Sequence, residues 1–310
     1  MRTDRTLRVA TRGSPLARLQ TELVARMLEA ADPGVRVEPL VVTTRGDELA
    51  DVALERIGGQ GVFVTEVQAA VVDGRADLAV HSAKDLPPVV LDGLTVGAVP
   101  PRGDPRDALV GCRLGELAPG AVVATGSARR RAQLANLRPD LTFVELRGNM
   151  ARRLARAGDH GVSAVVAAAA ALIRLGLEDQ MTEVLAPRDV LPQVGQGALA
   201  VECRADDDAL RGRLDAVDDA PSHFTLDAER ALLAGLGANC QVPVAGWAEP
   251  LASGEVRLHG MMASGDGRVL VRAHVDAAAG SDPDALGAEV ARMLLEDCGG
   301  SALDDWSAPG

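Results

Sequence analysis

The chain has 310 residues, of which 47% are hydrophobic, so it is long enough to bury a substantial core in two or three domains. A formal net charge of −12 and an aromatic content of 2% disfavour nucleic acids and membrane surfaces as partners, because both attract basic proteins. It contains no run of about 18 uninterrupted apolar residues and no apolar signal segment, so we expect a cytoplasmic protein.

The N-terminal residues predict a repeated unit of strand, turn and helix. Positions 7–11 alternate like a short strand, and Ser14 then suits the N-cap of an amphipathic helix over 15–29 with proline at its first position. Free N–H groups at this helix start, beside Arg12, suit an anion, although an ordinary capped helix explains the same residues equally well. A second strand is predicted over 35–43.

The next segment ends in a lysine and an aspartate. A glycine-rich stretch over 57–61 predicts a loop, either a lid or a linker, before a helix over 63–73 and a strand over 77–81. Lys84 and Asp85 follow that strand, at the edge where open α/β sheets place their ligands. The alternative is a surface ion pair, which would contribute little to stability. The position of the pair favours a functional role.

A second lobe is predicted after a connection over 100–107 that is rich in proline and charge. There a strand over 121–124 leads into a helix that ends near Leu137, and arginines at 129–131 occupy its first turn. Cations beside the positive end of a helix dipole each cost about 0.3 to 1 kcal/mol. We therefore expect a negative group to compensate them.

The same arrangement follows at once, with a strand over 143–146 and a helix that opens with arginines 152–153. Between positions 129 and 156 there are eight arginines and two acids. Because the arginine fork binds carboxylates through two hydrogen bonds, two helix starts rimmed by arginine predict a site for a polycarboxylate. A solvated basic face is the alternative.

The remaining residues complete three predicted domains. A strand over 198–203 returns the chain to the first lobe, and the residues from 221 onward predict a helix, three strands and a last helix over 283–296. The predicted domains are 1–100 plus 198–220 (first α/β lobe), 101–197 (second α/β lobe) and 221–310 (small α+β domain).

Cys240 lies at the junction between a helix and a strand of the third domain. A lone cysteine is more often a small buried hydrophobic residue than a reactive group. The four cysteines form no Cys-x-x-Cys pair and the five histidines have no metal-ligand spacing, so we expect reduced thiols and no metal. A cysteine hydrolase is disfavoured, because no histidine or acid is placed by sequence to pair with Cys240.

Taken together, the motifs resemble the porphobilinogen deaminase family, also called hydroxymethylbilane synthases. They occur in the family's order and cover residues 7 to about 250. The motifs are Ala-Thr-Arg-Gly-Ser-Pro-Leu-Ala (10–17), Thr-Arg-Gly-Asp (44–47), His-Ser-Ala-Lys-Asp-Leu-Pro (81–87), Thr-Gly-Ser-Ala-Arg-Arg (125–130), Leu-Arg-Gly-Asn (146–149), Arg-Leu-Gly-Leu (174–177), Gly-Gln-Gly-Ala (195–198) and Cys-Gln-Val-Pro (240–243).

The resemblance implies an α/β fold with two lobes like those of periplasmic binding proteins and a third small α+β domain. It implies a transferase of tetrapyrrole (haem) biosynthesis that joins four porphobilinogen molecules head to tail into hydroxymethylbilane, with release of ammonia. The implied cofactor is a dipyrromethane joined to Cys240 by a thioether. A cytoplasmic monomer with porphobilinogen as its small-molecule partner is expected.

The resemblance also assigns roles to individual residues. Asp85 is the implied catalytic residue, because a fixed carboxylate near the pyrrole N–H groups would stabilise positive charge and help to move protons. The implied cofactor-binding residues are Cys240, Lys84, Asp85, Thr125, Ser127, Arg129, Arg130, Arg147 and Gly148. The implied substrate-binding residues are Arg12, Ser14, Arg147, Arg153, Arg174 and Gln196.

The sequence departs from the common family pattern in several places. Gln60 and Thr65 occupy positions where many members have lysine, which puts loop contacts with the substrate in question. Residues 126–128 replace the usual Ser-Ser-Leu, and Asn239 replaces a glycine before the cysteine. The main rival hypothesis is a binding protein of the same two-lobed design that retains affinity for polycarboxylates without turnover.

Overall fold

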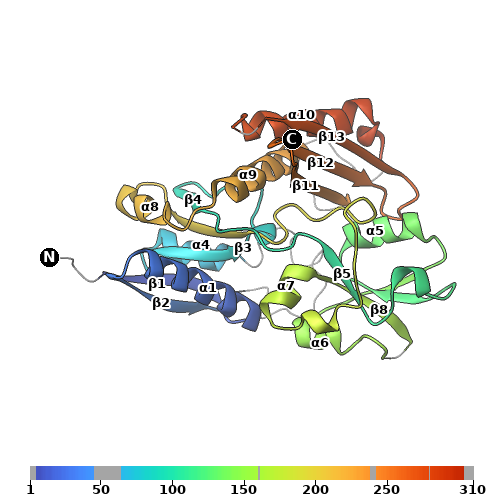
Figure 1. Ribbon diagram of the computed structural model, residues 1–310, viewed down its shortest axis with the longest axis horizontal. Helices are drawn as coiled ribbons and strands as arrows, with labels where there is room; N and C mark the ends of the chain where they lie inside the picture. Colours follow the sequence, from blue (N-terminus) through green and yellow to red (C-terminus); the bar gives the residue numbers. More distant parts are fainter. Residues whose placement is uncertain (1–4, 45–63, 160, 238–241, 279, 304–310) are drawn as a thin grey trace. The chain divides into compact units, whose positions relative to one another are not determined.

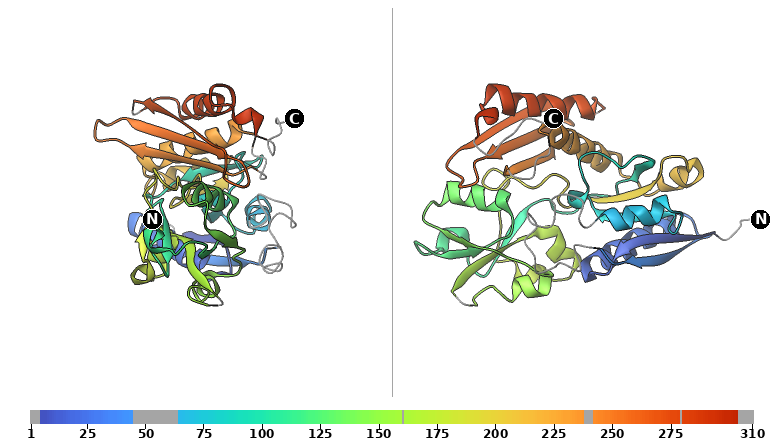
Figure 2. Two further views of the ribbon diagram at one scale, coloured as in Figure 1. Left: turned by 90° about the vertical axis from the view of Figure 1, so that its right-hand side faces the viewer. Right: turned by 180° about the vertical axis from the view of Figure 1, so that it is seen from behind.

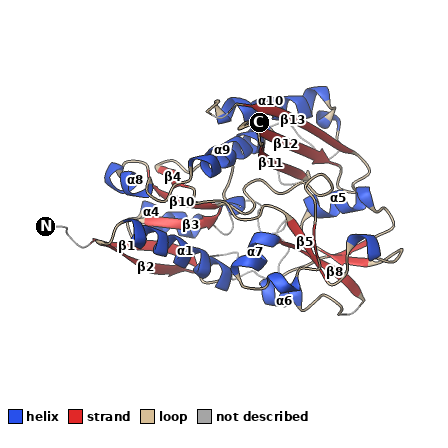
Figure 3. Cartoon of the chain, viewed as in Figure 1, coloured by secondary structure: helices blue, strands red, loops and turns tan. Residues whose placement is uncertain are grey.

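The computed structural model describes residues 5–44, 64–159, 161–237, 242–278 and 280–303. The chain forms two compact units, Met1–Gly103 with Ala198–Phe224 and Asp104–Gly197 with Thr225–Gly310. Figure 1 gives the order of their helices and strands, and Figure 3 separates the two kinds of element by colour. None of the helices in the described ranges is long and apolar enough to cross a membrane.

The first unit contains a five-stranded sheet in the order β2-β1-β3-β10-β4. The neighbours β2, β1 and β3 run parallel, whereas β10 runs antiparallel to both β3 and β4. Its elements are β1 (Arg5–Arg12), α1 (Pro15–Ala31), β2 (Val35–Val42), α4 (Thr65–Val72), β3 (Leu78–Ser82), the 3₁₀ turn η1 (Ala83–Asp85), β4 (Leu94–Ala98), β10 (Leu199–Arg204) and α8 (Asp208–Leu214). The predicted strands and the return of the chain at 198–203 are confirmed.

The second unit contains a sheet of the same design in the order β7-β6-β8-β5-β9. Here too the first three strands are parallel, and the strand that follows the crossing, β5, lies antiparallel between the third and the last. Its elements are β5 (Asp107–Val110), η2 (Leu114–Glu116), β6 (Val122–Ala124), α5 (Ala128–Leu137), β7 (Thr142–Val144), α6 (Met150–Leu154), β8 (Val162–Ala168), α7 (Ala169–Arg174), η3 (Glu178–Gln180) and β9 (Glu183–Val184).

The same unit also contains an antiparallel sheet, β11-β12-β13, built from the C-terminal residues. Its elements are α9 (Ala220–Gly235), β11 (Val244–Pro250), β12 (Val256–Ala263), β13 (Leu270–Ala277), α10 (Pro283–Arg292), the π-helix η4 (Met293–Asp297) and the 3₁₀ turn η5 (Gly300–Ala302). The predicted fold class, with two α/β sheets and a small α+β portion, is confirmed. The three-domain boundaries remain a prediction.

Both faces of the C-terminal sheet are covered. On one face the paired residues Gly246 and Gly260 come close to Leu232 of α9 and, at Gly260, to Val290 of α10. Figure 2 shows the C-terminal sheet and its helices from two further sides. On the other face Met261 joins a buried cluster that includes Ala132 of α5. The C-terminal sheet therefore shares a core with the second α/β sheet, which explains why both belong to one compact unit.

Two glycines offer a matched test of helix packing. A Cβ added at Gly287 of α10 would lie 2.5 Å from the Cβ of Ala231 and 2.5 Å from the backbone N of Leu232, whereas one at Gly212 of α8 meets nothing within 4 Å. We expect Gly287→Ala to lower the free energy of unfolding by about 1–3 kcal/mol through overpacking. Gly212→Ala should raise it by about 0.4–1 kcal/mol, because alanine reduces the entropy of the unfolded chain.

Urea unfolding of both variants measures the difference. Equal stability of Gly287→Ala and the parent protein would contradict the close approach of α9 and α10.

Candidate functional site

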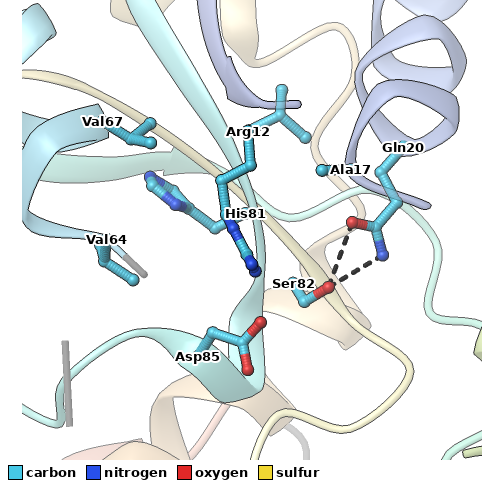
Figure 4. A pocket seen from close by; sticks show the side chains of 9 residues that line it. Arg12, Ala17, Gln20, Val64, Val67, His81, Ser82 and Asp85 are labelled. Atoms are coloured by element: carbon cyan, nitrogen blue, oxygen red, sulfur yellow. Dashed lines mark hydrogen bonds between the residues drawn. The ribbon is translucent and has the colours of Figure 1, made fainter. Parts of the chain in front are cut away.

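A pocket lies at the carboxyl ends of β1 and β3 in the first unit. Its polar lining is Arg12 at the end of β1, Gln20 of α1, His81 and Ser82 at the end of β3, and Asp85 of η1. Figure 4 shows the Arg12 side chain extending toward the end of the pocket that holds Asp85. The pocket thus brings a guanidinium and a carboxylate to the sheet edge where α/β proteins bind ligands.

Local hydrogen bonds hold the pocket walls in place. The amide of Gln20 and the hydroxyl of Ser82 face each other, with Gln20 Nε2 2.9 Å and Gln20 Oε1 3.1 Å from Ser82 Oγ. The Ser14 side chain accepts a hydrogen bond from the backbone N–H of Ala17 at 3.3 Å, so Ser14 is the N-cap of α1 as predicted. These contacts tie α1 to the end of β3.

Lys84 and Asp85 occur in the 3₁₀ turn η1, directly after β3. Both side chains are half-buried. Among the described residues that line the pocket, Asp85 is present and Lys84 is not. Asp85 therefore lines the pocket, whereas its neighbour Lys84 does not.

In the second unit, two of the predicted arginines surround a buried aspartate. Asp107, the first residue of β5, is 0% exposed, and its Oδ2 lies 2.8 Å from Nη2 of Arg129. Its Oδ1 lies 2.7 Å from Nη2 of Arg130 and 2.8 Å from Nε2 of Gln196. The negative group expected near this helix start is therefore supplied by the protein itself.

Two further donors of this cluster bind backbone carbonyls. Arg129 donates to the carbonyl of Leu191 at 2.6 Å, and Arg130 donates to that of Val166 at 3.2 Å. The buried Nε of Arg129 has no hydrogen-bond partner within the described residues. Two guanidinium groups against one carboxylate leave an excess positive charge, which suits the cluster to an anionic ligand.

Opposing effects act on the pKa of Asp107. Burial raises this pKa, but the charges of Arg129 and Arg130 and the hydrogen bonds from Arg130 and Gln196 lower it by more. The net result is a pKa well below the usual range of an aspartate. Asp107 thus stays ionised, because its charge is stabilised in the folded protein.

Asp107 is not among the site residues that the sequence predicts, because the composition of residues 100–107 predicts a connection there. The only local signal is a single acid before three apolar residues, Ala-Leu-Val, and a strand of four residues is too short to show a period. The arginines in the first turn of α5 did point to a missing negative group.

The sequence predicts arginines in the first turn of both helices, where they oppose the helix dipole. This prediction is confirmed for α5 and is wrong for α6. The helix α6 has only five residues, and Arg152 and Arg153 lie in its last turn, where the dipole favours cations. Asn149 caps its start by accepting from the backbone N–H of Arg152 at 3.0 Å. The second helix start therefore offers no separate reason to expect an anion.

Arg147 and Arg153 flank the turn before α6. Nε of Arg147 lies 2.8 Å from Oε1 of Glu145, while its buried Nη2 has no hydrogen-bond partner among the residues that the structure describes. Arg153 donates from Nε to the carbonyl of Gly148 at 2.8 Å, and Gly148 has φ of +95°. The turn thus places two guanidinium groups beside a backbone conformation that favours glycine.

Three further predicted residues support α5 and α7. Ser127 caps α5 by accepting from the backbone N–H of Arg130 at 3.4 Å, and the hydroxyl of Thr125 accepts from the backbone N–H of Ser127 at 3.2 Å. Arg174 at the end of α7 donates to the carbonyl of Gly197 at 2.7 Å. Burial lowers the pKa of Arg174 to about 10.

The predicted site residues therefore form two groups, each within one unit. The group in the first unit is Arg12, Ser14, Lys84 and Asp85, and that in the second is Thr125, Ser127, Arg129, Arg130, Arg147, Gly148, Arg153, Arg174 and Gln196. The predicted attachment residue Cys240, and with it Gln60 and Asn239, lies outside the described residues.

Comparisons with known proteins agree over almost the whole chain. Residues 7–212 match the family model "Porphobilinogen deaminase, dipyromethane cofactor binding domain", and residues 223–296 match "Porphobilinogen deaminase, C-terminal domain". A porphobilinogen deaminase of Roseiflexus sp. (strain RS-1) is 47% identical over 96% of this chain and 98% of its own length. One of Bacillus subtilis (strain 168) is 41% identical over 97% of this chain and 96% of its own length.

Solved structures show a more distant similarity. The methionine binding protein MetQ is 14% identical, with a TM-score of 0.42 over 68% of this chain and 89% of its own. A TRAP periplasmic solute binding protein from Desulfovibrio salexigens is 12% identical, with a TM-score of 0.43 over 74% of this chain and 77% of its own.

Replacing the buried aspartate tests the ion cluster. We expect Asp107→Asn to lower the free energy of unfolding at pH 7 by about 3–5 kcal/mol, because an amide leaves two buried guanidinium groups without a counter-charge. The surface pair of half-buried Arg138 and exposed Asp140 supplies the control, and Asp140→Asn should change stability little.

The pH dependence follows from the sign of the shift. Because folding lowers the pKa of Asp107, its stabilisation is present above the unfolded-state pKa of about 3.9 and is lost as the pH falls toward the folded-state value. Asp107→Asn should therefore remove part of the loss of stability on acidification below about pH 4. Denaturant unfolding at several pH values checks both effects, and parallel pH curves for variant and parent would contradict the assignment.

Proposed function

The chain belongs to the porphobilinogen deaminase family, and from this premise we propose which of its residues carry the reaction. The protein is a transferase of tetrapyrrole biosynthesis that joins four porphobilinogen molecules head to tail into hydroxymethylbilane and releases ammonia. The observation that carries the proposed site is the pocket in which Arg12 and Asp85 both line the carboxyl ends of parallel strands.

We assign the central chemical role to Asp85. Each porphobilinogen loses its amine and develops positive charge on the pyrrole before the next carbon–carbon bond forms. A fixed carboxylate beside the pyrrole N–H groups stabilises that charge and accepts or passes protons. The single turn η1 holds Asp85 at the end of β3, so its carboxylate is positioned before the substrate binds.

Arginines then bind the acid arms of the substrate. Porphobilinogen carries an acetate and a propionate, which match the planar fork of a guanidinium. Arg12 supplies such a group in the pocket of Asp85, and Ser14 lies at the start of the adjacent helix. Arg153 and Arg174, which lie in the second unit, have the same proposed role.

The family's cofactor is a dipyrromethane, which supplies a free pyrrole carbon as the primer for chain growth. Its carboxylate arms fit the second unit, because buried nitrogens of Arg129 and Arg147 lack hydrogen-bond partners among the described residues. We propose that these arms are held by Lys84, Thr125, Ser127, Arg129, Arg130, Arg147 and Gly148, and that Asp85 binds the cofactor through its pyrrole N–H groups. Gln196, which donates to Asp107, is proposed to bind the substrate. Covalent attachment is proposed at Cys240.

The proposal includes a monomer that works in the cytoplasm. A reducing compartment is proposed for it, and Cys112, Cys203 and Cys298 form no disulfide within the described residues. Light scattering on the purified protein measures the oligomeric state, and the mass of two chains would contradict a monomer.

Loss of the attachment residue gives the first test. The parent protein should weigh more than its amino acids by one dipyrromethane, and its denatured form should develop colour with Ehrlich's reagent. Cys240→Ser should weigh only what its amino acids weigh, give no colour and lose activity. Intact mass spectrometry decides the matter, and a fully active parent of unmodified mass would overturn the proposed attachment.

Removal of the carboxylate gives the second test. We expect Asp85→Ala to fold normally and to slow hydroxymethylbilane formation by about 10²–10⁴-fold, the range of general acid–base catalysis. Asp92→Ala is the matched control, because Asp92 is an exposed acid in the following loop. Single-turnover measurements compare the variants, and normal turnover by Asp85→Ala would refute the assigned role.

A further inference from the structure

A buried acid lies behind the pocket of Asp85, and nothing in the proposed mechanism uses it. Glu202 belongs to β10, whose other residues from Leu199 to Cys203 are apolar and buried. Glu202 itself is 1% exposed. A carboxylate in such surroundings costs several kcal/mol unless it is paired, so its partners explain its presence.

Two side chains lie against this carboxylate, and one of them, Gln68, hydrogen-bonds to it. Nε2 of Gln68 lies 2.9 Å from Oε1 and 3.0 Å from Oε2 of Glu202, and Nε2 of His81 lies 3.1 Å from Oε2. All three side chains are buried. Nε2 of His81 has no hydrogen-bond partner within the described residues, so its contact with this carboxylate is a close approach that is not aligned as a hydrogen bond.

The strand register explains why these side chains meet. Glu202 is paired with Ala79 and His81 with Ala200 in the antiparallel β3–β10 ladder, so the acid and the histidine are diagonal neighbours on one face of the sheet. The two alanines opposite them leave room for the larger side chains. Gln68 comes from α4, which covers this face.

His81 connects the buried acid with the pocket. It lines the pocket together with Arg12 and Asp85, and Ser82, the next residue, also lines it. His81 therefore both contacts the buried carboxylate and lines the pocket.

The carboxylate of Glu202 restricts which ring nitrogen of His81 carries the hydrogen. An ionised carboxylate only accepts hydrogen bonds, and the amide of Gln68 already donates to it. Nε2 of His81 must therefore carry a hydrogen to interact favourably with Glu202. A carboxylate 3.1 Å from one ring nitrogen repels a lone pair there, so it favours the tautomer whose hydrogen is on that nitrogen.

We propose that Glu202 is a positioning residue for the reaction: through Nε2 it fixes the tautomer and orientation of His81 in the wall of the Asp85 pocket. Gln68 holds the carboxylate in place for that purpose. The proposal rests on the assignment of this pocket to the reaction. It assigns no direct contact between Glu202 and the substrate.

The test uses full-length protein with ¹⁵N-labelled histidine. In the parent, NMR should show a protonated Nε2 for His81, whose signals are assigned by their absence in His81→Gln. Glu202→Gln keeps the shape of the side chain, but an amide can both donate and accept. We expect its His81 signals to move toward a mixture of tautomers.

Kinetics of Glu202→Gln give the second readout. We expect kcat to fall by about 10- to 100-fold with KM within about twofold, because misplacement of a pocket wall affects the reacting geometry more than substrate binding. A merely structural role would lower the melting temperature and leave both the His81 signals and kcat of the folded protein unchanged.

The chain offers a matched control in the C-terminal sheet. Nε2 of His259 lies 3.0 Å from Oε2 of Glu249, outside any pocket assigned to the reaction. Glu249→Gln should move the signals of His259 and leave kcat within about twofold of the parent. An equal loss of kcat in both variants would show a general effect and overturn the proposal.

Other outcomes are also decisive. A parent protein in which His81 carries its hydrogen on Nδ1 alone would overturn the proposal, even if Glu202→Gln failed to fold. A parent that formed no hydroxymethylbilane would defeat the proposed function, whereas the His81 signals would still report the tautomer.

Discussion

The ion cluster around Asp107 is the interaction on which the second unit depends. One carboxylate at the start of β5 binds the guanidinium groups of Arg129 and Arg130 and the amide of Gln196. These residues join a strand, a helix start and the loop before the return to the first unit. Because the cluster is buried, each charge needs the others, and the arginines are held before any ligand arrives.

Both α/β units apply one topological rule. The strand that follows each crossing, β5 or β10, enters antiparallel beside the third strand of its sheet. In each case that strand carries a buried acid, Asp107 or Glu202, which binds residues of the neighbouring elements. An acid on such a strand can contact side chains from elements distant in sequence, because the strand lies between two others in its sheet.

Much of the fold followed from the sequence because the local signals were strong. Ser14 and the proline after it start α1, and the alternating or apolar runs of the sheets are regular enough to predict strands. The motifs also identified the residues that gather around Asp85. The weak points were the four-residue strand at Asp107 and the helix α6, whose arginines lie at its end rather than its start.

The sequence alone determined the family and the kinds of group in the site, since motifs and charge are properties of the chain order. Only the tertiary structure decided which arginine nitrogens bind a carboxylate of the protein itself. The partner of Arg129, Asp107, is distant in sequence and is brought to it by strand pairing. The tertiary structure also decided that Glu202 lies 3.1 Å from His81, an approach set by the register of antiparallel strands. Local patterns predict local structure, whereas burial and pairing of charges depend on which segments the fold brings together.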